Sequence, residues 1–319
     1  MAELKKEEPA FEELKKEVLA RRGFDLNQYS QEYVKRRMNA RIMVLGLSRD
    51  SWSEYRELLH GDEKEYAALF DTFSINVTEF YRDTSVWRML QNDILPKLIN
   101  EKKNAKPSVL RIWSAGCSTG EEPYSLAILL KELMPPGNTI QLAFIATDID
   151  IDAVRRAREG IFKREALKGV ATMNPEWIKK YFTPLGTLSA EGEALEYQVI
   201  PELRRMVIFK EHNFLSDAPF IHIDAIFCRN AMIYLTPQVK EELIGTFFAS
   251  LIPNGLLVIG KSEIIFLGKG RYFFYPVNTI EHIYRKERRK VEPKDFNYPG
   301  PERRGKWWWG HENEKSEEK

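Results

Sequence analysis

Val109-Leu-Arg-Ile-Trp-Ser-Ala-Gly-Cys-Ser-Thr-Gly-Glu-Glu-Pro-Tyr-Ser125 is the stretch of sequence that decides how this chain folds. Its apolar residues from Val109 to Trp113 predict a buried strand, its glycines predict a tight turn, and Pro123 favours the start of a helix. A strand, a glycine turn and a helix in this order form the first unit of an α/β fold that binds nucleotide cofactors. The stretch therefore predicts a parallel sheet with a ligand site at its edge.

The glycine turn departs from the dinucleotide-binding pattern. Three residues separate Gly116 from Gly120, so the G-x-G-x-x-G spacing fails. Glu121 and Glu122 then stand at the helix start, where a phosphate would otherwise dock. Two carboxylates would repel a pyrophosphate, but they suit a ligand that has an ammonium group and no phosphate. The turn therefore favours S-adenosylmethionine over NAD.

Two later strands also end in polar residues. The apolar run Leu142–Thr147 is followed by Asp148, and an acid after the second strand is where ribose hydroxyls can be held. The run Asp224–Cys228 is followed by Arg229 and Asn230. Because ligands of open parallel sheets bind outside the carboxyl ends of the strands, we expect these residues to line one site.

The rest of the chain predicts a second, helical domain and an α/β domain. Residues 1–73 carry apolar side chains at helical spacing, whereas strands and helices alternate from Val109 to about Arg285. A linker over 74–84 and a helix over Ser85–Lys103 are expected between the two domains. Within the α/β domain we expect a small antiparallel β insertion over about 184–209, with strands at Leu195–Ile200 and Arg205–Phe209, and a closing hairpin of Tyr272–Tyr275 and Ile280–Tyr284. The charged tail over 286–319 is expected to be disordered.

Composition excludes several classes of protein. The 48 basic and 47 acidic residues nearly cancel, so overall attraction to nucleic acid is not expected. Two cysteines cannot build a disulfide scaffold, and we expect both to be free thiols. The five histidines are scattered, which predicts no metal site. No apolar run approaches the roughly 18 residues of a membrane span, and the charged N-terminal residues do not resemble a secretory signal, so we expect a cytoplasmic protein.

Six motifs follow one another along the chain: Ser74-Ile-Asn-Val-Thr-Glu-Phe-Tyr-Arg82, Trp113–Ser125, Ala146-Thr-Asp-Ile-Asp150, His212-Asn-Phe-Leu215, Phe227-Cys-Arg-Asn-Ala-Met-Ile-Tyr234 and Gly255-Leu-Leu-Val-Ile-Gly-Lys-Ser-Glu263. In this order they closely resemble the chemotaxis receptor methyltransferases (CheR), which methylate receptor glutamates with S-adenosylmethionine. The resemblance covers roughly Leu14 to Arg285. It implies a Rossmann-like methyltransferase sheet over 85–285, an N-terminal substrate-recognition domain over 1–73, and a linker that contributes to the cofactor site.

The resemblance also implies roles for individual residues. The residues implied to bind the cofactor are Asn76, Thr78, Arg82, Gly116, Glu122, Asp148, Asn213, Phe214, Arg229 and Asn230. Asp148 would hold the ribose, and Asn213 and Phe214 would edge the adenine. The residues alone leave open which of Glu121 and Glu122 faces the ligand, and the family pattern favours Glu122. Arg82 and Tyr234, the latter expected one helical turn beyond Asn230, are the hypothetical catalytic pair.

The implied substrate is the cytoplasmic helical domain of a chemoreceptor. The segment Tyr33–Arg41 predicts a helix with a basic face made of Lys35, Arg36, Arg37 and Arg41, which suits a glutamate-rich helix. We expect a monomer that inserts into no membrane and binds no nucleic acid. The loop Gly186–Glu193 is acidic, so recognition that does not depend on a receptor tail peptide is expected.

Other readings stay open. A methyltransferase of the same family could act on a different signalling protein or a small acid. A non-catalytic S-adenosylmethionine-binding sensor is disfavoured because Arg82, Asn230 and Tyr234 are all present. An NAD enzyme is disfavoured by the failed glycine spacing.

Overall fold

The computed structural model describes residues 4–73, 78–134, 137–188, 194–265 and 270–287. The chain divides into two compact units. The smaller unit is Met1–Ile75 with Ile233–Lys240, and the larger unit is Asn76–Met232 with Glu241–Lys319. Each unit is described by itself below. None of the helices described here is both long and apolar enough to cross a membrane.

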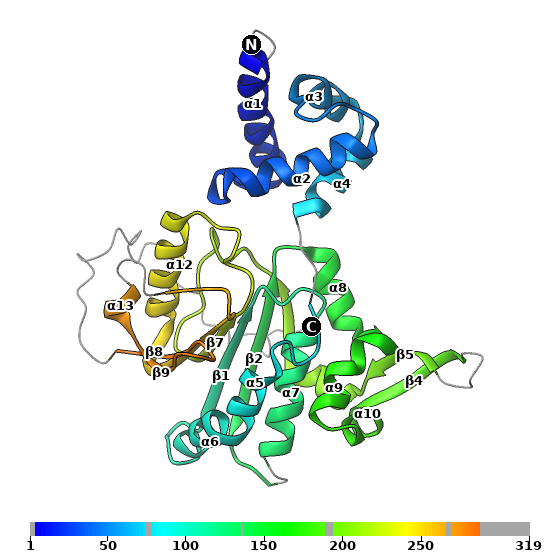
Figure 1. Cartoon of the computed structure of the whole chain (residues 1–319). Coiled ribbons are helices and arrows are strands. Elements are labelled where there is room, and N and C mark those ends of the chain that lie inside the picture. Colours follow the sequence, from blue (N-terminus) through cyan, green and yellow to red (C-terminus); the bar gives the residue numbers. More distant parts are fainter. Residues whose placement is uncertain (1–3, 74–77, 135–136, 189–193, 266–269, 288–319) are drawn as a thin grey trace, which may run out of the picture. The chain divides into compact units, whose positions relative to one another are not determined.

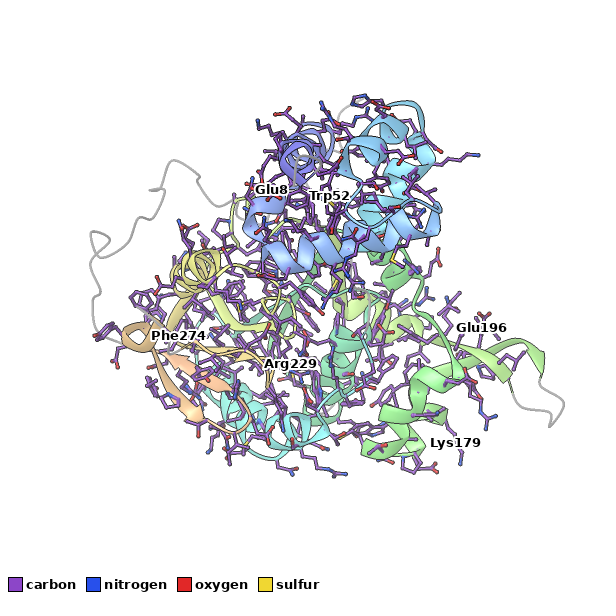
Figure 2. All side chains as sticks on the ribbon, turned by 45° about the horizontal axis from the view of Figure 1, so that its top comes forward. Glu8, Trp52, Lys179, Glu196, Arg229 and Phe274 are labelled. Carbon is purple, nitrogen blue, oxygen red and sulfur yellow. The ribbon has the colours of Figure 1, made fainter. Side chains whose placement is uncertain are left out.

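The smaller unit is helical, as the apolar spacing predicts. Its helices are α1 (Leu4–Arg22), a short 3-10 turn η1 (Leu26–Gln28), α2 (Gln31–Val44), α3 (Trp52–Gly61) and α4 (Glu63–Phe73). Ser30 caps α2, because its hydroxyl accepts from the backbone N–H of Tyr33. The core is aromatic: Trp52 is buried, and its ring lies 5.0 Å from that of Phe11 in α1. Figure 2 shows Trp52 among these helices.

A segment distant in sequence completes this unit. The backbone N–H of Ser30 donates to the Tyr234 carbonyl at 2.9 Å, and that of Thr236 donates to the Gln28 carbonyl at 2.9 Å. The ring of Tyr234 stacks on that of Tyr33, with 4.5 Å between centroids and 25° between planes. Residues 233–240 are thus held against α2 and η1, an arrangement that local sequence patterns do not reveal.

The larger unit is built on a seven-stranded sheet, which confirms the predicted α/β class. The order is β6-β2-β1-β7-β8-β10-β9. The strands are β1 (Val109–Ala115), β2 (Gln141–Asp148), β6 (Val207–Glu211), β7 (Ile223–Cys228), β8 (Leu251–Ile259), β9 (Phe274–Asn278) and β10 (Ile283–Lys286). The first five in spatial order run parallel, and β10 pairs antiparallel with both β8 and β9. The predicted closing hairpin is therefore present, although its first strand begins at Phe274 after a helical turn over α13 (Gly270–Phe273).

Helices bury both faces of this sheet. Ile112 of β1 belongs to the core that contains the apolar side of α7 (Glu121–Leu133). Side chains alternate along a strand, so Trp113 points to the other face. There its ring lies 5.6 Å from that of Phe247 in α12 (Pro237–Ser250). Before β1 the chain forms α5 (Thr84–Met89), the π-helical turn η2 (Leu90–Ile94) and α6 (Leu95–Lys103), and after β2 it forms α8 (Ile151–Glu159). Figure 1 labels α5, α6 and α8.

The small antiparallel sheet differs from its prediction. It contains β3 (Ile161–Lys163), β5 (Ala194–Val199) and β4 (Phe182–Leu188) in the order β3-β5-β4. The expected strand at Leu195–Ile200 corresponds to β5, but the assignment of Arg205–Phe209 to this insertion was wrong. Val207–Glu211 instead pairs parallel with β2 at the edge of the large sheet. An edge strand is buried on one face only, so its alternation of buried Val207 and Phe209 with exposed Ile208 imitates a hairpin strand.

The short helices η3 (Arg164–Leu167), α9 (Lys168–Met173) and α10 (Glu176–Tyr181) join β3 to β4, and α11 (Pro201–Met206) joins β5 to β6.

A buried ion pair ties α6 to the sheet. The Asp224 side chain in β7 is fully buried, and its carboxylate forms an ion pair with the Lys102 ammonium. The same carboxylate accepts from the backbone N–H of Arg111 in β1 at 2.8 Å. Burial raises the pKa of Asp224, and Lys102 opposes that rise. The lysine therefore compensates a charge that would otherwise be costly to bury.

Replacing Lys102 with methionine should lower the free energy of unfolding by about 3–5 kcal/mol, because a buried carboxylate loses its partner. The loss should shrink as the pH falls, since protonation of Asp224 removes the uncompensated charge. Urea denaturation at several pH values measures both effects. The matched control is Lys103→Met on the exposed side of the same helix, which should change stability by less than about 0.5 kcal/mol. Equal losses in the two variants would contradict the role of the ion pair.

Candidate active site

Backbone hydrogen bonds join the carboxyl ends of β1, β2 and β6. After β1, the N–H groups of Gly116 and Cys117 both donate to the carbonyl of Thr147 in β2, at 2.8 and 2.9 Å. After β6, the N–H of His212 donates to the carbonyl of Asp148 at 2.9 Å. The loops that carry the predicted site residues of the sheet therefore begin at one edge, as the parallel pattern predicts.

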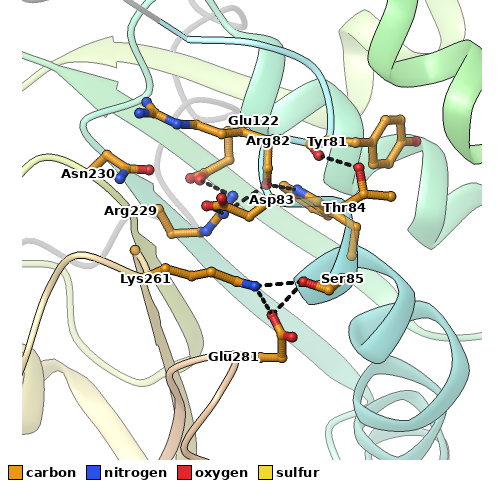
Figure 3. A network of polar contacts seen from close by, with 12 residues as sticks. Tyr81, Arg82, Asp83, Thr84, Ser85, Glu122, Arg229, Asn230, Lys261 and Glu281 are labelled. Atoms are coloured by element: carbon orange, nitrogen blue, oxygen red, sulfur yellow. Dashed lines mark hydrogen bonds and ion pairs between the residues drawn. The ribbon is translucent and has the colours of Figure 1, made fainter.

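Glu122 and Glu121 point to different surroundings. The Ser114 hydroxyl donates to Glu122 Oε1 at 2.9 Å, and Arg229 Nη1 lies 3.7 Å from Glu122 Oε2. Glu121 instead accepts from the Thr119 hydroxyl at 2.7 Å. Burial raises the pKa of Glu122, and the positive charges of Arg229 and Arg82 oppose that rise. Glu122 is therefore the carboxylate that joins the polar cluster drawn in Figure 3.

Asp148 shapes the turn after β1 from the end of β2. Its Oδ2 accepts from the backbone N–H of Ser118 at 2.7 Å, and its Oδ1 accepts from that of Asp150 at 3.0 Å. Burial raises the pKa of Asp148, while these N–H groups lower it. The helix-capping role falls to Asp150, which accepts from the first N–H groups of α8. Asp148 thus remains directed at the turn, where a ribose could be held.

Gly116 and Phe214 lie together at this edge. A Cβ atom on Gly116 would lie 3.0 Å from the Ala231 Cβ and 3.7 Å from the Phe214 ring, and the φ of +81° already favours glycine. The Asn213 side-chain oxygen accepts from the Leu215 N–H at 3.0 Å, so it shapes the turn that presents Phe214. The Phe214 ring thus lies next to the backbone of Gly116, at the edge where an aromatic base could pack.

The described part of the linker is fixed to the larger unit. The ring of Phe80 packs edge-on against Phe162 and Phe182, with centroids 4.8 and 5.5 Å away. A Cβ on Gly169 would come within 1.8 Å of the Phe80 carbonyl oxygen, so only glycine permits this contact. The Tyr81 N–H donates to the Ser125 hydroxyl at 3.0 Å. Because Phe80 and Tyr81 are held in this way, Arg82 lies at the edge of the sheet.

Two linker residues adopt a strained conformation. Tyr81 and Asp83 have φ values of +55° and +58°, in the left-handed region that ordinary residues avoid. Such strain persists only where the surroundings hold it in place, and it gathers at functional sites. Thr78, earlier in the same segment, is half-buried, and Asn76 lies outside the described residues.

Arg229 joins the linker to the sheet. Its side chain is 2% exposed, and its Nη2 donates to both the Arg82 carbonyl and Asp83 Oδ2 at 2.8 Å. The guanidinium also lies over the ring of Trp87, 5.5 Å from its centroid. Figure 2 shows Arg229 in the interior of the larger unit. The residue predicted to line the pocket thus holds the linker with its Nη2 group, while its buried Nε has no hydrogen-bond partner among the described residues.

Asn230 follows in the left-handed conformation, with a φ of +62°. Its backbone N–H donates to the carboxylate of Glu263 at 3.0 Å. Its side-chain Oδ1 is buried and has no hydrogen-bond partner within the described parts of the chain. A buried acceptor without a donor is costly, so Oδ1 is suited to a ligand that brings an N–H group. Glu263 itself was not predicted as a site residue. Its position after a buried strand, in the last quoted motif, was the available indication.

Tyr234 does not lie one helical turn beyond Asn230, because residues 230–234 form bends and turns rather than a helix. The left-handed Asn230 prevents a continuous helix at this point. Tyr234 belongs with the smaller unit through its stacking on Tyr33. Its pairing with Arg82 therefore stays a prediction.

The four basic residues predicted for substrate binding are not equivalent. Arg41 forms a two-point ion pair with buried Glu65, which also accepts from the Tyr55 hydroxyl at 2.8 Å. Lys35 lies 3.2 Å from Glu8. The guanidinium carbons of Arg36 and Arg37 lie 5.9 and 5.6 Å from the centroid of the Tyr33 ring. Arg41 thus contributes to the fold of the smaller unit, and substrate binding by Lys35, Arg36 and Arg37 stays a prediction.

The described residues offer few side chains that could bind a metal ion or react as a thiol nucleophile. The described residues contain no group of three or more His, Cys, Asp or Glu side chains that could hold a metal ion. Cys117 and Cys228 are free thiols, as expected, and burial raises the pKa of both. Buried thiols with raised pKa values are poor nucleophiles.

Comparison with known proteins identifies both parts of the chain. The family description "CheR methyltransferase, all-alpha domain" matches residues 9–74, and "CheR methyltransferase, SAM binding domain" matches residues 76–279. A chemotaxis protein methyltransferase of Borreliella burgdorferi is 34% identical over 260 residues, which cover 80% of this chain and 87% of that protein. The namesake from Salmonella typhimurium is 33% identical over 77% of this chain and 80% of that protein. The one from Listeria innocua is 31% identical over 82% and 92%.

The acids at the sheet edge, the bare glycine beside Phe214 and the buried acceptor of Asn230 fit the ribose, the adenine and the amino group of one ligand. The two matching domains and the 34% identical relative establish that the chain belongs to the CheR methyltransferase family and is an S-adenosylmethionine-dependent methyltransferase.

Proposed function

We propose that this enzyme transfers the methyl group of S-adenosylmethionine to glutamate side chains of chemoreceptors, forming methyl esters and S-adenosylhomocysteine. The observation that carries the proposal is a sheet edge at which the Glu122 carboxylate lies 3.7 Å from Arg229 and the Arg229 guanidinium holds the linker that carries Arg82. A glutamate substrate needs no base, because its pKa of about 4.3 leaves it ionised at neutral pH. The names of the relatives support a chemotaxis substrate. We place the enzyme in the cytoplasm, with the methylated part of the receptor.

The cofactor supplies an electrophilic methyl group on a sulfonium ion. Asp148 would hold the ribose hydroxyls, Phe214 would contact the adenine, and Glu122 with Asn230 would hold the amino-acid part. The protein has to bring the acceptor oxygen to about 3–3.5 Å from the methyl carbon and in line with the bond that breaks. An anion and a cation become two neutral products, so exclusion of water favours the reaction.

Arg82 and Tyr234 remain the proposed catalytic residues, with Asn76 and Thr78 closing the pocket from the linker. The positive charge of Arg82, after that of Arg229, opposes the rise that burial causes in the pKa of Glu122, and a guanidinium is suited to the carboxylate of the cofactor. The Tyr234 hydroxyl would orient the methyl group or the incoming glutamate. Its ring is already fixed by stacking on Tyr33.

The proposed function is tested by transfer of labelled methyl from S-adenosylmethionine to a chemoreceptor cytoplasmic fragment. Label that alkali releases as methanol identifies a glutamate methyl ester. A fragment with its methylated glutamates changed to glutamine is the control and should accept no label. Transfer to another signalling protein, with none to the receptor fragment, would favour the alternative substrate. Label that resists alkali would contradict ester formation.

Tyr234→Phe keeps the stacked ring but removes the hydroxyl. We expect kcat to fall by about tenfold to a hundredfold, the usual cost of one hydrogen bond to a charged group, while affinity for S-adenosylhomocysteine stays the same. Steady-state kinetics and calorimetry measure the two quantities. Tyr29→Phe, in the same aromatic cluster, is the matched control. Unchanged turnover in Tyr234→Phe would remove this residue from catalysis.

We propose that Arg36 and Arg37 contact the substrate, whereas Arg41 supports the fold through its ion pair with Glu65. Arg36→Glu and Arg37→Glu should each lower kcat/KM for the receptor by roughly tenfold, because they reverse a steering charge. Neither should change cofactor affinity. Arg41→Glu should instead lower the melting temperature, because buried Glu65 would face a like charge.

Lys64→Glu, an exposed charge reversal on α4, serves as the control for net charge. If Lys64→Glu lowers receptor methylation as much as Arg37→Glu does, the effect comes from net charge and not from a contact surface on α2.

A further inference from the structure

Glu263 is a buried carboxylate that bridges two loops at the candidate site. It lies four residues beyond the end of β8 and is 4% exposed. Its Oε2 accepts from the backbone N–H groups of Asn230, at 3.0 Å, and Gly260, at 2.7 Å. Its Oε1 accepts from the N–H of Met232 at 2.7 Å. One side chain therefore satisfies three backbone donors in the loops that follow β7 and β8.

The carboxylate stabilises a strained loop as well as three backbone donors. Asn230 leaves the strand in the left-handed conformation, which costs free energy for a residue with a side chain. An ionised carboxylate only accepts hydrogen bonds, and bonds of this kind are about twice as strong as neutral ones. Glu263 therefore compensates both the strain at Asn230 and the burial of these amides.

The fit around the carboxylate leaves no spare room. A Cβ on Gly260 would lie 2.8 Å from both the backbone nitrogen and Nδ2 of Asn230, and 2.9 Å from Glu263 Oε2. Gly260, Asn230 and Glu263 are thus mutually fitted. The same loop leads from Arg229, which holds the linker, to Asn230, whose Oδ1 is buried without a partner in the described structure.

We propose that Glu263 is a positioning residue for the cofactor: it fixes the backbone of Asn230 and thereby directs the Asn230 side-chain oxygen to the ligand. The inference rests on the proposed role of Asn230 as a cofactor contact. It does not depend on which protein is methylated. Loss of the carboxylate then weakens cofactor binding even though Glu263 itself touches no ligand.

Glu263→Gln tests the proposal, because an amide keeps the shape but turns one acceptor into a donor. That donor would face a backbone N–H head-on and would release the loop. We expect the Kd for S-adenosylhomocysteine, measured by calorimetry well below the melting temperature, to rise by about tenfold or more. The matched control is Glu281→Gln. Glu281 is also a buried glutamate of the larger unit, but it is bound to Ser85 and Lys261. The Glu281→Gln substitution should lower the melting temperature without changing the Kd for S-adenosylhomocysteine.

A double-mutant cycle separates positioning from general stability. Asn230→Gly tolerates the left-handed backbone and removes only the side chain. If Glu263 acts through Asn230, Glu263→Gln should add little to the Kd of Asn230→Gly. A wild-type Kd for Glu263→Gln, or effects of the two changes that add in full, would overturn the proposal. Failure to methylate a receptor would leave this binding result intact, so the two proposals fail separately.

Discussion

The buried guanidinium of Arg229 is the interaction on which the candidate site depends. It holds the Arg82 carbonyl and the Asp83 carboxylate at hydrogen-bond distance and lies 3.7 Å from the Glu122 carboxylate. A buried cation requires such partners, because an unpaired charge in the interior is prohibitively costly. The same requirement brings the linker, the start of α7 and the end of β7 to one point. Arg82 is placed beside Glu122 as a consequence of that arrangement.

Acidic groups at the same edge explain the choice of cofactor. The half-buried carboxylates of Glu122 and Asp148 have raised pKa values and are partly compensated, the first by a serine hydroxyl and arginines, the second by backbone N–H groups. Such a lining penalises a phosphate and favours a nucleoside with hydroxyl and ammonium donors. The chemistry of methyl transfer to a carboxylate then needs alignment and exclusion of water more than it needs acid or base catalysis.

The sequence predicted features that depend on local pattern. Buried parallel strands appear as continuous apolar runs, so β1, β2 and β7 and the polar residues at their ends could be found. β6 was misassigned because an edge strand alternates like a hairpin strand. The helical spacing assumed for Tyr234 failed at the left-handed Asn230, whose conformation is imposed by contacts made elsewhere in the chain.

Local sequence patterns do not reveal which residues, distant in the chain, a charged side chain contacts in the fold. Arg41 looked like part of a basic face, but its partner Glu65 lies 24 residues away and is buried. Glu263 likewise reaches back 33 residues to Asn230. In both cases a charged side chain takes its place in the fold from the residue that it meets, and a charge pattern alone does not indicate that residue.

The most direct measurement for the central claim is a crystal structure of the protein with S-adenosylhomocysteine bound. We predict the ligand at the carboxyl ends of β1, β2 and β7, with its ribose at Asp148, its adenine beside Phe214 and Gly116, and its amino-acid part among Glu122, Asn230 and Arg82. A ligand bound elsewhere on the molecule, with this edge of the sheet empty, would contradict it.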